Sequence, residues 1–115
     1  FLIVSGLILA YPRMFAFQEN STTLYLLHLW IGLVFVVIFP IYSWDHIKKN
    51  LDRLKKINLL SISGIIQLIA GLVLIISGLP LLLYGTDVFE LASITHLIFT
   101  FVLAICLIFH KISRK

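Results

Sequence analysis

Four long apolar stretches constrain this chain more than any other feature of its sequence. They cover approximately residues 1–17, 24–47, 59–84 and 88–112. An α-helix needs about 20 apolar residues to cross the hydrocarbon core of a bilayer. The last three stretches reach that length, whereas the first is shorter and is interrupted by Pro12 and Arg13. We therefore expect residues 1–115 to form one transmembrane domain, an all-α, up-down-up-down four-helix bundle in the membrane.

The composition excludes an ordinary soluble domain. Of the 115 residues, 61% are hydrophobic and only 12% are charged, whereas soluble domains are about half apolar and about a quarter charged. A chain this short has too little interior to hide so much apolar surface from water. It begins at Phe1 within an apolar stretch, so we expect an upstream segment. Cys106 is the only cysteine, and we interpret it as a small packing residue.

Basic residues gather on one side of the predicted bundle. Eight of the nine lie in the link after the second stretch or in the C-terminal tail: Lys48, Lys49, Arg53, Lys55, Lys56, Lys111, Arg114 and Lys115. The positive-inside rule places both segments in the cytoplasm, and we expect a bacterial or archaeal cytoplasmic membrane. Within the link, 47–58, apolar residues recur at helical spacing, which predicts an amphipathic continuation of the second helix on the inner leaflet. We therefore interpret the net charge of +4 as a signal that orients the protein in the membrane and not as a sign of nucleic-acid binding.

All four histidines fall within, or at the ends of, the second and fourth stretches: His28, His46, His96 and His110. Ionisable side chains inside a membrane usually face the bundle interior, and neutral imidazole is a common ligand of haem iron. At 100° per residue, the 18 residues from His28 to His46 make five full turns, and the 14 from His96 to His110 fall 40° short of four. Each pair therefore shares one helix face. Because the two helices run parallel, His28 is expected level with His96 and His46 level with His110, as two axially ligated haems require.

A stripe of glycines on the third stretch supports the same interpretation. Gly64, Gly71 and Gly78 are seven residues apart, so they drift by only about 20° per step. In an antiparallel helix, Gly64 comes level with the inner histidines and Gly78 with the outer ones. Glycine lets a flat porphyrin approach closely, although it also suits a seam between packed helices. Beside the histidines, we favour the porphyrin.

These features resemble the di-haem four-helix bundles of the respiratory b-type cytochromes. That group includes the cytochrome b of quinol-oxidising complexes and the haem-b anchor subunits of membrane formate dehydrogenases and hydrogenases. The segments His28-Leu-Trp-Ile-Gly32 and Trp44-Asp-His-Ile-Lys-Lys-Asn50 are similar to the second helix of the small bacterial anchors. The resemblance implies two haem b groups held by the four histidines, with Gly32, Gly64 and Gly78 beside them.

One spacing departs from that family. His28 and His46 are 18 residues apart instead of 14. Position 42, where a 14-residue step would place the second histidine, holds Tyr42 instead. At about 1.5 Å per residue, 18 residues span roughly 27 Å and 14 span roughly 21 Å. A kink at Pro40 could absorb part of the difference; otherwise the inner haem has a different ligand or is absent. The outer pair, His28 and His96, is therefore the firmer prediction.

Other polar and aromatic residues allow two interpretations each. Arg13 could neutralise a haem propionate or simply snorkel to the lipid headgroups. Phe35 and Phe39 share the histidine face and could fill the space between the haems. Gln67 could bond a quinone, but a bond to a neighbouring helix is the interpretation we favour.

We expect an electron-transfer subunit that carries no substrate chemistry itself. The protein would supply ligands and a dry environment for two haems, with a quinone or quinol as redox partner and other subunits of a membrane redox complex around it. The alternatives are a haem-free membrane anchor or assembly subunit and a small four-helix transporter. A transporter usually has a carboxylate buried in a span, whereas all five acids here lie at helix ends or in links: Glu19, Asp45, Asp52, Asp87 and Glu90.

Overall fold

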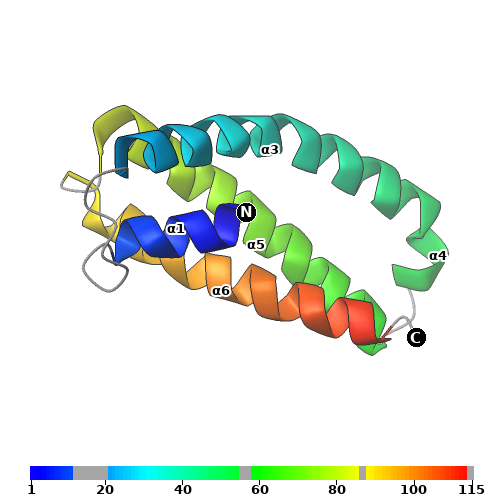
Figure 1. Ribbon diagram of the computed structural model, residues 1–115. Coiled ribbons are helices and arrows are strands. Elements are labelled where there is room, and N and C mark those ends of the chain that lie inside the picture. Colours follow the sequence, from blue (N-terminus) through cyan, green and yellow to red (C-terminus); the bar gives the residue numbers. More distant parts are fainter. Residues whose placement is uncertain (12–20, 55–57, 86–87, 114–115) are drawn as a thin grey trace.

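The computed structural model describes residues 1–11, 21–54, 58–85 and 88–113. Within these ranges the chain is helical and contains no strand. The helices are α1 (Leu2–Ala10), α3 (Ser21–Lys49), α4 (Leu51–Leu54), α5 (Leu59–Tyr84) and α6 (Glu90–Ser113). Figure 1 shows α1, α3, α5 and α6 alternating in direction within an elongated bundle of 49 × 26 × 22 Å. This confirms the all-α, up-down-up-down four-helix bundle.

Three helices are long and apolar enough to cross a membrane: Thr22–Lys49, Leu59–Tyr84 and Glu90–Ile112. They correspond to the second, third and fourth apolar stretches. The third helix has the predicted bounds, the second extends beyond 24–47 at both ends, and the fourth begins at Glu90 instead of residue 88. In the first stretch the helix covers Leu2–Ala10, and residues 12–17 of the prediction lie outside the described ranges.

The interior of the bundle is made of small residues, many of them polar. The buried ones are Ser5, Ser61, Ser63, Ala70, Gly71, Ser77 and Thr100. Large apolar side chains lie outside, for example Leu83, which is 70% exposed, and Leu91, which is 78% exposed. In a bilayer, helices gain nothing by hiding leucine from lipid, and small residues let their backbones approach. The distribution is the one expected of a membrane bundle.

Both ends of α5 are set by residues at the helix termini. The Asn58 side-chain oxygen accepts a hydrogen bond of 2.8 Å from the Ser61 backbone N–H, which satisfies one of the free donors of the first turn. At the other end, Gly85 adopts a φ of 80° and donates its N–H to the Leu81 carbonyl. A positive φ is easily reached by glycine. The helix therefore stops there despite the apolar run before it.

A turn at Asn50 separates α3 from the short helix α4. The Asn50 N–H donates to the Ile47 carbonyl, and its side-chain amide donates to the His46 carbonyl. These bonds close the last turn of α3 and redirect the chain. The amphipathic helix predicted as a continuation of α3 over 47–58 is therefore divided at this residue, and residues 55–57 of that prediction lie outside the described ranges.

Packing within the bundle is uneven. Helices α5 and α6 pack against each other along their length, and the Gln67 amide donates a 2.8 Å hydrogen bond to the Cys106 carbonyl across this seam. This confirms that Gln67 bonds a neighbouring helix. By contrast, α3 packs mainly on α1, which also touches α6, and meets α5 at fewer points. Helices α1 and α5 thus lie between the two histidine-bearing helices, α3 and α6, which face each other across the bundle (Figure 1).

Candidate functional site

The His28 ring, on α3, is held by two consecutive residues of α1. Its Nδ1 lies 2.8 Å from the Ser5 hydroxyl. Its Cε1 lies 3.2 Å from the place that a Cβ on Gly6 would occupy. Ser5 is 2% exposed, so this hydrogen bond is shielded from the surroundings. The absence of a side chain at Gly6 is what leaves room for the ring.

The His96 ring, on α6, is held in the same way by α5. Its Nδ1 lies 3.0 Å from the Ser77 hydroxyl, and its Cε1 lies 3.3 Å from the Cβ position of Gly78. Gly78 thus lies level with the outer histidine of α6, as the antiparallel register predicts.

His28 and His96 belong to helices that face each other across the bundle, and the two rings are near enough for a charge on one to act on the other. Each ring directs its Nδ1 to a serine hydroxyl, so Nε2 is the nitrogen that each could offer to a ligand. These are the two rings that the sequence predicts to be level.

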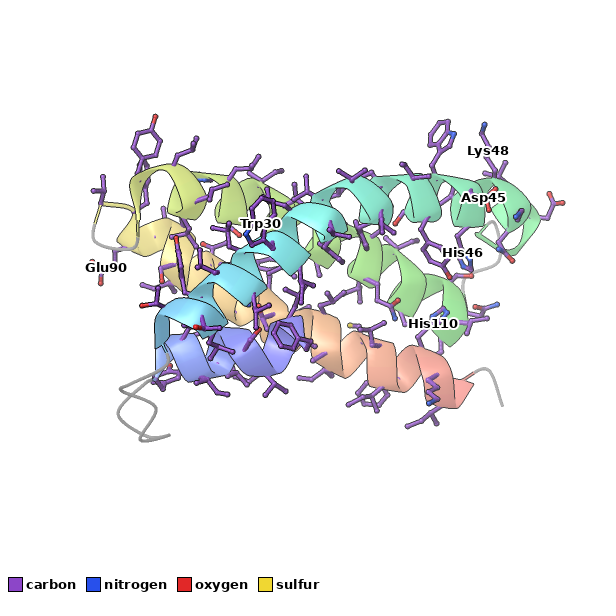
Figure 2. The ribbon with its side chains drawn as sticks, turned by 45° about the horizontal axis from the view of Figure 1, so that its top comes forward. Trp30, Asp45, His46, Lys48, Glu90 and His110 are labelled. Carbon is purple, nitrogen blue, oxygen red and sulfur yellow. The ribbon has the colours of Figure 1, made fainter. Side chains whose placement is uncertain are left out.

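The two inner histidines have different surroundings. The His110 Nδ1 lies 3.0 Å from the Ser63 hydroxyl on α5, and its Cε1 lies 3.8 Å from the Cβ position of Gly64. His46 is exposed, and its ring stacks on Tyr42 of the same helix with centroids 5.8 Å apart. Figure 2 shows His46 and His110 at the same end of the bundle, opposite the end that carries Glu90.

The remaining residues that the sequence predicts near the site differ in their surroundings. A Cβ at Gly71 would collide with the Phe39 ring, which packs directly on the α5 backbone. Gly32 has no atom within 4 Å of its Cβ position, so its face of α3 is open. Arg13 lies outside the described residues.

The serines that contact the histidine rings are not among the residues predicted from the sequence. Ser5, Ser63 and Ser77 are each followed by the glycine on which the ring rests. A recurring Ser-Gly dipeptide, present twice on one helix at the 14-residue step of His96 and His110, was the available signal. This dipeptide becomes apparent only when the residue before each glycine of the stripe is also considered.

Neither a cluster of metal ligands among the described residues nor a similarity to a known protein identifies the site. Within the described ranges, no three or more His, Cys, Asp or Glu side chains are placed to hold a metal ion together; the histidines form at most pairs. No protein-family model, no characterised protein and no solved structure matches this chain.

Proposed function

We propose that this chain is a membrane b-type cytochrome that carries electrons across the bilayer between two haem b groups. In this proposal it exchanges electrons with a quinone pool and serves as the membrane anchor of a larger redox complex. The basic end, with Lys48, Lys49 and Lys111, faces the cytoplasm by the positive-inside rule.

The observation that carries the proposal is the outer histidine pair. His28 and His96 come from opposite sides of the bundle, lie within electrostatic reach of each other, and each has its Nδ1 engaged by a buried serine. A histidine that ligates a metal usually directs its other ring nitrogen to a hydrogen-bond partner in this way. Two neutral imidazoles with Nε2 available are the donor set of a six-coordinate haem.

The surroundings of this pair also fit a large flat group. Helix α3 packs lightly against α5 and α6, and no atom of a neighbouring residue lies within 4 Å of the Cβ position of Gly32, one turn after His28. His28 and His96 would hold the outer haem, and α1 and α5 would fix the orientation of the two rings. The haem would supply a one-electron couple, while the surrounding apolar side chains exclude water and so tune its potential.

The inner pair supports a second haem less strongly. The His110 Nδ1 is engaged by a buried serine, as in the outer histidines, and His46 lies at the same end of the bundle. His46 is exposed and stacked on Tyr42, so it is less restrained than the other three rings. We propose that it completes the inner site when the haem is bound.

Visible spectroscopy of the purified protein tests the proposal. The protein is produced with ample haem, and a reduced-minus-oxidised spectrum is combined with haem quantification as the pyridine haemochrome. We expect a b-type α-band and a stoichiometry of two haems per chain. His28→Ala and His96→Ala should each remove one haem, and His46→Ala and His110→Ala the other.

The outcomes separate the parts of the proposal. A haem-free wild-type protein would refute the cytochrome function and favour a structural anchor. One haem, lost in His28→Ala but kept in His46→Ala, would refute the inner site alone. Tyr42→Phe is the matched control, because it keeps the stacked ring beside His46 and removes only a hydroxyl.

A further inference from the structure

Three histidines of this chain rest on the same two-residue unit. The sequence contains eight serines and six glycines, and it forms a Ser-Gly dipeptide three times: Ser5-Gly6, Ser63-Gly64 and Ser77-Gly78. Each of the three contacts a different histidine, and in each the serine oxygen faces Nδ1 while the glycine faces Cε1. We call this unit the Ser-Gly clamp.

The hydroxyl proton of each serine is already used within its own helix. Ser77 donates to the Val73 carbonyl at 2.7 Å, and Ser5 donates to the Phe1 carbonyl at 3.0 Å. Two oxygens 2.7 Å apart without a proton between them would repel each other. A serine hydroxyl has one proton to donate and lone pairs with which to accept. Towards the ring, therefore, the serine oxygen accepts, and Nδ1 carries the proton.

Ser63 has the same arrangement, with its hydroxyl 3.0 Å from the Leu60 carbonyl and 3.0 Å from the His110 Nδ1. A neutral imidazole carries only one proton. With that proton on Nδ1, the lone pair is on Nε2.

The glycine fixes the direction in which Nε2 points. Nδ1 and Cε1 are adjacent atoms of the ring, so the clamp holds one ring edge against the helix backbone. The distance from the ring Cε1 to the Cβ position of the glycine is shortest at Gly6 and Gly78, at 3.2 and 3.3 Å, and longer at Gly64, at 3.8 Å. A ring held along this edge cannot turn about its Cβ–Cγ bond without losing the hydrogen bond.

We propose that Ser5, Ser63 and Ser77 are positioning residues that lock His28, His110 and His96 in the Nδ1–H tautomer and present Nε2 as the ligand atom. The lock is a property of the protein before any cofactor binds. That the ligand atom serves haem iron rests on the proposed function. His46 has no such clamp among the described residues, so its ring is free to exchange between tautomers.

Nitrogen NMR on the haem-free protein tests the lock directly. The protein is labelled with ¹⁵N at the histidine rings and placed in lipid nanodiscs, where the ring nitrogen shifts distinguish Nδ1–H from Nε2–H. We expect Nδ1–H for three histidines and a tautomer mixture for His46. Ser77→Ala should release His96 alone, whereas Ser93→Ala, which removes a half-buried hydroxyl on α6 itself, should change none. A wild-type His96 in the Nε2–H form, or one unaffected by Ser77→Ala, would overturn the proposal.

Haem titration tests the ligand role separately. Loss of a hydrogen-bond partner behind a metal ligand typically weakens metal binding by about 10- to 100-fold, so Ser77→Ala should weaken the outer haem site by that factor and shift its reduction potential. Ser93→Ala should do neither. Unchanged affinity and potential in Ser77→Ala, in a protein that binds haem, would refute the ligand role. No haem binding by a wild-type protein whose tautomers are locked as expected would refute the proposed function and leave the lock supported.

Discussion

Replacing Gly71 with alanine is expected to weaken the crossing of α3 over α5. A Cβ at this position would collide with three atoms of the Phe39 ring, and the mildest of these contacts, with Cε2, would be 2.7 Å. Gly71 is buried, and the new carbon belongs to the rigid backbone of α5. The aromatic ring of Phe39 must therefore move out of its place against α5.

The magnitude follows from comparing two glycines. Alanine is favoured over glycine within a helix by about 1 kcal/mol, and this term is shared by Gly71→Ala and by Gly32→Ala, where nothing lies within 4 Å. Overpacking a close contact costs about 1–3 kcal/mol. The difference between the two variants isolates that cost, which is roughly a five- to 140-fold change in the unfolding equilibrium.

The assay is reversible unfolding in mixed micelles, in which the fraction of SDS is raised and helicity is followed by circular dichroism. Gly32→Ala is expected to be neutral or stabilising and Gly71→Ala destabilising. Combining Gly71→Ala with Phe39→Ala should remove the collision, so that the double variant is no less stable than Phe39→Ala alone. Equal stability of the two alanine variants, or a double variant that shows no relief, would refute the reasoning.

Two smaller effects follow from single hydrogen bonds. Gln67→Leu removes the bond to the Cys106 carbonyl and should cost about 0.6 kcal/mol, the typical value for a bond between membrane helices; the same unfolding assay measures it, and no loss would mean that the bond contributes nothing net. Asn58→Ala removes the cap on the Ser61 N–H and should cost about 1 kcal/mol, whereas Asn58→Ser should restore most of it. An equal loss in both Asn58 variants would argue against capping.

The helices were predictable because a bilayer demands long apolar runs, and this requirement dominates all others over 24–47, 59–84 and 88–112. The residues at which the helices end were less predictable. The stop at Lys49 depends on the Asn50 side chain bonding back to the His46 carbonyl, a choice between helix continuation and turn that the helical spacing of the link does not reveal. Periodicity reports which face is apolar and not where a side chain closes the last turn.

The site was predictable in part for a similar reason. The levels of His28 and His96 follow from helix geometry alone, so counting residues was enough. Which helix each histidine ring contacts depends on the side-chain rotamers and on the order of the helices around the bundle. The spacing of residues in the sequence does not provide either. Ser5 and Ser77 are therefore not predicted from the sequence. Gly78 is predicted to make room for a porphyrin, and the structure places the His96 ring beside it.

The uneven packing distinguishes the closely packed pair α5 and α6 from the more lightly packed α3. His96 and His110 belong to one helix, and both clamps that hold them belong to α5, so their separation of roughly 21 Å along the axis is set by two closely packed rods. His28 and His46 are carried by α3, which contacts its neighbours at fewer points and contains Pro40. A shift of α3 therefore widens or narrows the gap within each histidine pair without altering the distance between the two levels.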